Sequence, residues 1–146
     1  MRALGLDVGS KTIGVAISDP DGLIASARET LPRQGNKSDA ATVAELSARE
    51  AIGRIVVGLP LELDGAVGHR ARRVQRFITQ LEETLAAAEA LAAVKVVTWD
   101  ERFSTAAAER TLLAADVSRR KRKLHIDALA AQHILQGWLD AQGRPA

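Results

Sequence analysis

The chain of 146 residues contains no cysteine and only four aromatic residues, two tryptophans and two phenylalanines. The absence of cysteine excludes disulfide bonds and thiol chemistry and favours a cytoplasmic location. With so few aromatic residues, stacking on nucleobases cannot be the main mode of ligand binding. No apolar run approaches the roughly 18 residues of a membrane span, and the N-terminal stretch lacks the apolar segment of a secretory signal. These absences indicate a protein without a membrane partner.

The length suits one well-buried domain, residues 1–146, and is too short for two ordinary domains. The net charge is only +2, but the basic residues are clustered. A polyanionic partner or a solvated helix face explains the first cluster equally well, whereas five consecutive positive charges in the second favour an anionic ligand. The first cluster is Arg70, Arg72, Arg73 and Arg76, and the second is Arg119, Arg120, Lys121, Arg122 and Lys123.

Hydrophobic periodicity predicts strands and helices in an order that fits a mixed sheet. Three strands, joined by tight turns, come first and are expected to form an antiparallel meander. A helix, a continuous apolar strand of the parallel type, a long helix and a fifth strand follow. The order is typical of an α/β protein with the ribonuclease H-like fold, a mixed five-stranded sheet flanked by helices. The predicted strands are 4–8, 13–17, 23–27, 54–59 and 94–98, the helices 38–52, 69–92, 104–114 and 125–141, and the main loops 32–37, 60–68 and 116–123.

Three acidic positions stand out from this pattern. Asp7 lies in the first predicted strand, where burying an unpaired carboxylate costs several kcal/mol. Asp100 and Glu101 end the fifth strand, so alternation directs one of them inward. Asp127 falls on the apolar stripe of the last helix. Mg²⁺ or Mn²⁺ would neutralise such carboxylates, and paired cations of this kind can activate water for phosphodiester hydrolysis.

Each of these acids also has a purely structural explanation. Asp7 could be a turn residue that accepts hydrogen bonds from neighbouring amides. Glu101 could pair with Arg102 or Arg110 at the surface, and Asp127 could cap the last helix if that helix began one turn later. All three explanations would have to hold together to remove the metal hypothesis.

Four sequence blocks match a known pattern in order along almost the whole chain. Together they closely resemble the YqgF family, also called RuvX, which comprises nucleases similar to Holliday junction resolvases and assigned to maturation of the 5′ end of pre-16S rRNA. The resemblance implies a metal-dependent nuclease with Asp7, Glu101 and Asp127 as its catalytic and metal-binding acids. In place of the family's usual Leu-Thr-Thr, this chain has Phe103-Ser104-Thr105, which keeps an apolar residue and a capping hydroxyl. The blocks are Gly5–Ala16, Val56–Leu61 with Asp64 and Gly65, Asp100–Thr105, and Asp127–Ala131.

The first functional hypothesis is therefore an endonuclease that acts on structured RNA with Mg²⁺ or Mn²⁺. Lys11, Arg102 and the basic run from Arg119 to Lys123 are predicted to bind the substrate phosphates. Branched DNA is the alternative substrate, because RuvC-like resolvases share this fold. The expected partners are pre-rRNA or branched DNA and ribosomal precursor particles, and the chain is expected to be a monomer or a homodimer.

Two other classes of function compete with a nuclease. The Asp-x-Gly-Ser pattern at Asp7 also opens the actin, hexokinase and Hsp70 ATPases, but those proteins bind nucleotide between two such domains and this chain has room for one. The other class is a nucleic-acid-binding factor without catalysis, for which Asp7→Asn would leave binding and cellular role intact.

Overall fold

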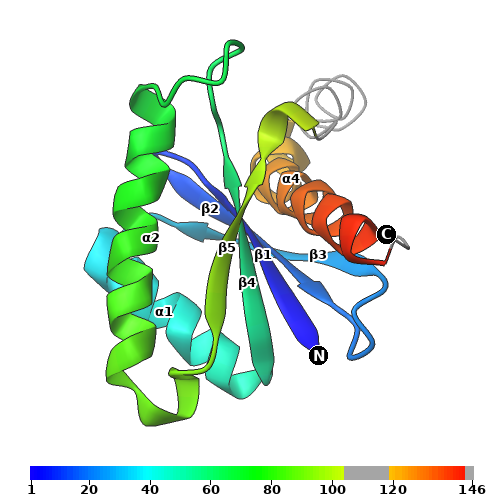
Figure 1. Ribbon diagram of the computed structural model, residues 1–146. Helices are drawn as coiled ribbons and strands as arrows, with labels where there is room; N and C mark the ends of the chain where they lie inside the picture. Colours follow the sequence, from blue (N-terminus) through cyan, green and yellow to red (C-terminus); the bar gives the residue numbers. More distant parts are fainter. Residues whose placement is uncertain (104–118, 144–146) are drawn as a thin grey trace.

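The computed structural model describes residues 1–103 and 119–143. Its centre is a five-stranded sheet with the strand order β3-β2-β1-β4-β5 (Figure 1). The first three strands form an antiparallel meander, and the last two extend the sheet in parallel with β1. The predicted mixed sheet is therefore confirmed. The strands are β1 (Arg2–Val8), β2 (Thr12–Ser18), β3 (Ala25–Pro32), β4 (Ile52–Leu59) and β5 (Lys95–Asp100).

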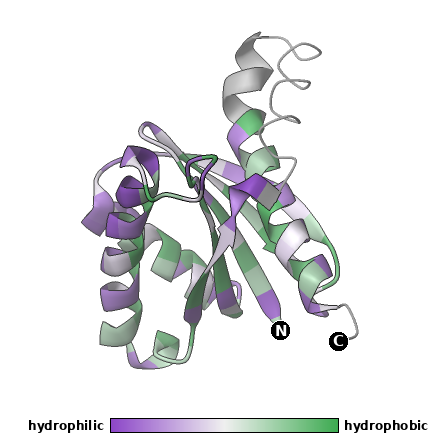
Figure 2. Ribbon diagram, turned by 45° about the horizontal axis from the view of Figure 1, so that its top comes forward, coloured by the Kyte–Doolittle hydropathy of each residue, from purple (hydrophilic) through white to green (hydrophobic). Residues whose placement is uncertain are grey.

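Helices cover both faces of the sheet, and the central strands are mainly hydrophobic (Figures 1 and 2). Helices α1 and α2 pack on one face over a core that includes Phe77 and Leu81. Helix α4 packs on the other face, chiefly against β1, β2 and β3. No helix in the described part of the chain is long and apolar enough to cross a bilayer. The helices are α1 (Asn36–Arg49), α2 (His69–Ala87) and α4 (Arg119–Gln142), with short 3₁₀ helices η1 (Glu89–Leu91) and η2 (Glu101–Phe103).

The predicted bounds of the third strand were wrong. The Asp19 carboxylate accepts hydrogen bonds from the backbone amides of Leu23 and Ile24, at 2.7 and 2.8 Å. These bonds hold both residues in the turn, so β3 begins at Ala25 and continues to Pro32. Those amide bonds also keep the pKa of Asp19 below its usual value. The helix predicted from residue 38 begins earlier, with Gly35 as its N-cap.

The prediction of a basic loop at 116–123 was also wrong in its second half. The backbone of residues 119–123 is helical and forms the first turns of α4. Arginine and lysine are good helix formers, and here this propensity outweighs their mutual repulsion. Asp127 therefore lies eight positions inside α4, which excludes the alternative that it caps the helix. The helix predicted at 104–114 lies outside the described residues.

Two glycines allow α4 to approach the sheet closely. A Cβ atom on Gly14 of β2 would lie 1.9 Å from the backbone oxygen of Asp127. A Cβ on Gly5 of β1 would lie 2.7 Å from Cβ of Leu135. Both separations are far inside van der Waals contact, so any larger residue would push the helix outward. The absence of a side chain at these positions therefore determines how near Asp127 comes to β1 and β2.

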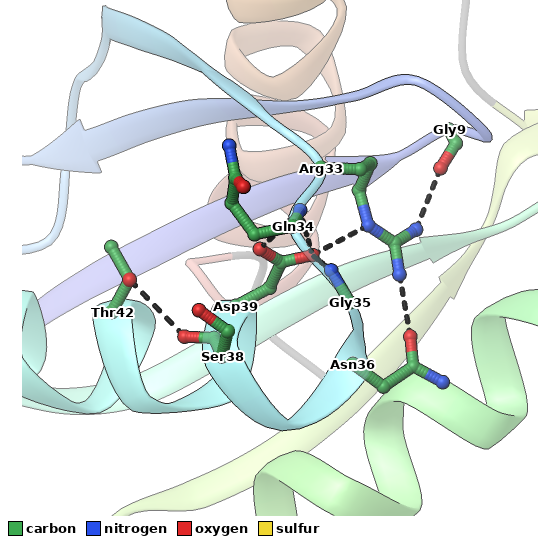
Figure 3. A network of polar contacts seen from close by, with 8 residues as sticks. All are labelled: Gly9, Arg33, Gln34, Gly35, Asn36, Ser38, Asp39 and Thr42. Atoms are coloured by element: carbon green, nitrogen blue, oxygen red, sulfur yellow. Dashed lines mark hydrogen bonds and ion pairs between the residues drawn. The ribbon is translucent and has the colours of Figure 1, made fainter.

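A polar network joins the turn after β1 to the start of α1 (Figure 3). The guanidinium of Arg33 pairs with the Asp39 carboxylate at 2.7 Å and donates to the Gly9 carbonyl at 2.7 Å and to the side chain of Asn36. Asp39 is only 5% exposed, and its carboxylate also accepts bonds from backbone amides of the segment before α1. The network holds the turn that follows Asp7 in a fixed position.

We expect Arg33→Met to lower the free energy of unfolding by about 3 kcal/mol, because the substitution leaves a buried carboxylate without its cation. Urea denaturation measures the change. Arg28→Met is the matched control, since Arg28 pairs with Glu50 at 2.7 Å but is 31% exposed. An exposed pair contributes about 1 kcal/mol or less. Equal effects of the two substitutions would contradict a special role for the Arg33 network.

Candidate active site

Asp7 is the next-to-last residue of β1 and is half-buried. It pairs with Gly14 in the antiparallel ladder between β1 and β2. Asp7 is therefore a strand residue, and the alternative that it is a turn aspartate is wrong. Since β1 is the middle strand of the sheet, its carboxyl end brings Asp7 to the centre of that edge.

Glu101 and Asp100 point to different partners at the end of β5. Strand alternation is not the reason, because β5 ends at Asp100 and Glu101 is the first residue of η2. The Glu101 carboxylate lies against β4, where a Cβ atom on Gly58 would be 2.6 Å from Glu101 Oε1. Asp100 instead accepts hydrogen bonds from the Arg102 guanidinium, at 2.7 Å from Nη2 to Oδ2 and 3.1 Å from Nε to Oδ1. This side-chain bonding lowers the pKa of Asp100 and raises that of Arg102. Asp100 is thus occupied by its neighbour, and Glu101 is the acid directed toward the other strands.

Asp127 is held by a residue from β2. The Thr12 hydroxyl donates a 2.5 Å hydrogen bond to Oδ2 of Asp127 across 115 positions of sequence. Asp127 is half-buried on the side of α4 that meets the sheet, and its backbone rests on Gly14. Thr12 therefore restricts the orientation of the carboxylate, and Gly14 sets its height above the strands.

These three acids, which come from three separate elements, share one pocket. The pocket has a volume of about 330 Å³ and opens where the carboxyl ends of β1 and β4 meet the first turns of α2. Ligands of open α/β sheets commonly bind at this edge. The described residues that line the pocket are Asp7, Val8, Gly9, Pro60, Arg70, Arg73, Glu101 and Asp127.

None of the substrate-binding residues predicted from the sequence is among the described lining residues of this pocket. Lys11 is exposed in the turn between β1 and β2. Arg102 is exposed, bound to Asp100, and 3.3 Å from the carbonyl of Leu63. The basic run from Arg119 to Lys123 is placed by its backbone alone, in the first turns of α4. Phosphate binding by these residues remains a prediction.

Sequence reasoning did not assign Thr12, Arg70 and Arg73 to the site. Arg70 and Arg73 were noticed only as part of a cluster that a solvated helix face explained equally well. Their spacing of three residues places them on one side of a helix, directly after the loop that follows β4. That spacing alone could not select the pair, because Arg73 and Arg76 are also three residues apart. The bond between Thr12 and Asp127 had no sequence signal, because it depends on how α4 docks on β2.

The donor atoms in the pocket suit a hard divalent cation. All three acids offer carboxylate oxygens, the ligands that Mg²⁺ and Mn²⁺ prefer. Gly58, without a side chain, leaves room for the Glu101 carboxylate beside β4. Among the described residues, however, no three acidic or histidine side chains already form a complete ligand group. The pocket therefore suits such an ion only by the chemistry of its donor atoms.

Comparison with solved structures shows the fold. The fowlpox virus resolvase in complex with Holliday junction DNA aligns with a TM-score of 0.60 at 11% identity, over 99% of this chain and 100% of that one. RuvC of T. thermophilus in complex with a Holliday junction substrate aligns with a TM-score of 0.56 at 18% identity, over 97% and 95%. The predicted ribonuclease H-like fold, which RuvC-like resolvases have, is confirmed.

Sequence comparison shows the family. A protein from Bacillus licheniformis, named "Putative pre-16S rRNA nuclease", is 49% identical over 143 residues, which are 97% of this chain and 98% of the relative. A protein of the same name from Myxococcus xanthus is 48% identical over 145 residues, 99% of this chain and 91% of the relative. The model of the RuvX family, described as Holliday junction resolvase, matches residues 1–141. With that match and these relatives, the chain belongs to the RuvX family.

Proposed function

We propose that this chain is a metal-dependent endonuclease that hydrolyses phosphodiester bonds in structured RNA, with the 5′ end of pre-16S rRNA as its substrate. The observation that carries the proposal is the meeting of Asp7, Glu101 and Asp127 in one pocket from three separate elements. Sequence relatives named for pre-16S rRNA support the choice of RNA. Such a function belongs in the cytoplasm, on ribosomal precursor particles.

Branched DNA is the second candidate substrate. The description of the family model and the Holliday junction bound to two proteins of the same fold favour it. A four-way junction has two strands to cut, so a resolvase would act as a dimer with two pockets. RNA processing needs only one pocket, and a monomer would suffice.

In the proposed mechanism, Asp7, Glu101 and Asp127 would hold Mg²⁺ or Mn²⁺ through carboxylate oxygens. When bound, such a cation would supply Lewis-acid activation of water and of the phosphate. Thr12 keeps the Asp127 carboxylate turned toward β2. In the hydrolysis, a P–O bond forms to the water oxygen and the P–O bond to one ribose oxygen breaks. The ribose oxygen gains a proton, and the attacking water loses one.

We expect Asp7→Asn, Glu101→Gln and Asp127→Asn each to lower the cleavage rate at least about 100-fold. Substituting a residue that hydrogen-bonds to a metal ligand typically lowers activity about 10- to 100-fold, so substituting the ligand itself should lower the rate at least as much. Cleavage of a 16S precursor RNA with Mg²⁺ or Mn²⁺ measures the rate, and calorimetry with Mn²⁺ measures metal binding independently. Asp140→Asn, an exposed position on the same helix, is the control and should change neither. Full activity in the three variants would refute the assignment.

The substrate is tested by incubating the wild-type protein with the 16S precursor or with a synthetic four-way DNA junction, under the same metal and salt conditions. We expect cleavage of the RNA near the mature 5′ end. Cleavage of the junction alone would reject the RNA assignment and support the resolvase. Binding of RNA without cleavage of either substrate would support the factor without catalysis.

We expect Thr12→Val to lower the cleavage rate about 10- to 100-fold, since valine keeps the shape of the side chain and removes the donor to Asp127. Thr12→Ser retains the hydroxyl and should keep the rate within a few-fold of wild type. Single-turnover kinetics on the RNA precursor separate the two variants. If valine and serine act alike, the Thr12 hydroxyl does not position Asp127.

A further inference from the structure

Two arginines of α2 lie in the same pocket as the three acids. Arg70 and Arg73 occupy the first turns of α2, three residues apart on one side of the helix, and both line the pocket. The same helix carries two further arginines that are not among the described lining residues. Arg72 is exposed and donates to the carbonyl of Val67 at 3.0 Å, and Arg76 is exposed. The basic cluster is thus divided between the pocket and the surface.

Among the residues that the structure describes, the two pocket arginines have no bonding partner. Within residues 1–103 and 119–143, neither the Arg70 nor the Arg73 side chain makes a hydrogen bond or an ion pair with a described residue. Arg33, by contrast, is fully engaged by Asp39, Gly9 and Asn36. With respect to the described part of the chain, the donors of Arg70 and Arg73 are therefore available to a ligand, and the two side chains are not paired with the acids.

The charges in the pocket identify the kind of ligand. Three carboxylates would repel a nucleic-acid phosphate, and the two guanidinium groups offset part of that repulsion. A guanidinium presents parallel N–H donors that match two phosphate oxygens, which a lysine cannot do. Arg73 is half-buried and Arg70 is exposed, so the pair extends from the pocket wall toward solvent. This arrangement fits a phosphate that belongs to a chain passing over the pocket.

The end of α2 itself is not the binding feature. A Cβ on Gly68, the N-cap of α2, would lie 2.1 Å from the carboxylate oxygen Oε1 of Glu62. A negative group already sits at this helix terminus, so the side chains of Arg70 and Arg73 must supply the attraction for an anion.

We propose that Arg70 and Arg73 form a phosphate clamp that binds the nucleic-acid backbone at the phosphate being cleaved, in the same pocket as Asp7, Glu101 and Asp127. The proposal rests on the proposed nuclease function and names the residues that hold its substrate. The clamp brings the phosphodiester to the carboxylates and offsets their repulsion. It is separate from the basic run of α4, which belongs to another element.

The clamp is tested first by binding alone, with EDTA present so that no cleavage occurs. Fluorescence anisotropy follows a fluorescein-labelled RNA hairpin that spans the 5′ boundary of 16S rRNA, at several salt concentrations. For the double variant Arg70→Gln/Arg73→Gln, we expect the slope of log affinity against log salt to shrink by about 1.4 to 1.8, the value for two lost phosphate contacts. Arg76→Gln, on the same helix, should leave the slope unchanged. A double variant with the slope of Arg76→Gln would overturn the clamp.

Cleavage kinetics provide the second arm. The double variant should lose at least about 100-fold in kcat/KM, since each charge-assisted phosphate contact is worth about 10- to 100-fold. Arg70→Lys/Arg73→Lys keeps both charges and loses the paired donors, so it should keep the salt slope but lose about tenfold or more in kcat/KM. Cleavage at the wild-type rate by either double variant would contradict the clamp. The lysine variant also answers the question if the glutamine variant does not fold.

The two arms separate failure of the clamp from failure of the proposed function. If the wild-type protein cleaves RNA and Asp7→Asn does not, but the arginine variants behave like Arg76→Gln, the nuclease stands and the clamp falls. If the wild-type protein cleaves nothing, the nuclease falls, and the salt slope still decides whether Arg70 and Arg73 bind phosphate. If the double variant instead lowers the free energy of unfolding and leaves the slope intact, the arginines are structural and the clamp is wrong.

Discussion

The close contact between α4 and the strands beneath it is the constraint on which the site depends. Backbone meets backbone where Asp127 rests on Gly14, and a second close approach at Gly5 holds the helix down along its length. Without this contact, Asp127 would stand away from the edge of the sheet where Asp7 lies. Thr12, only two residues before Gly14, then fixes the carboxylate by a single hydrogen bond. One short stretch of β2 thus controls both the height and the orientation of an acid from the far end of the chain.

The opposite face of the sheet contributes stability and charge. The larger core lies there, between the strands and helices α1 and α2. Arg33 links this layer to the turn after Asp7, and α2 directs two arginines into the pocket. The acidic groups of the pocket therefore come from the end of β1, from η2 directly after β5 and from α4, whereas its described positive groups come from α2. Negative and positive charges thus reach the pocket from different elements of the fold.

Much of this could be predicted from the sequence. Alternation in the first two strands and the apolar run of β4 were strong signals. Asp7 and Asp127 stood out because charge is costly in apolar segments. Glu101 was preferred to Asp100 only through the family resemblance. The failures involved competition between local interactions. The start of β3 was predicted two residues too early, because the amides of Leu23 and Ile24 bond to Asp19 instead of to a neighbouring strand. The start of α4 was predicted too late, because helix propensity extends the helix through a run of like charges. The choice of pocket arginines could not be made from composition, since all four arginines of α2 are chemically alike. Their directions depend on how the buried stripe of the helix, which includes Val74 and Phe77, packs on the sheet.

The helical start of α4 fixes the distance along the helix axis between the backbone of residues 119–123 and that of Asp127. At 1.5 Å of rise per residue, the backbone of residues 119–123 lies about 6 to 12 Å along the helix axis from Asp127. That span corresponds to about two to four nucleotides of a stacked strand at 3.4 Å each. A flexible loop would allow that separation to vary. In α4 the separation is set by the rise of the helix backbone, before any ligand is bound.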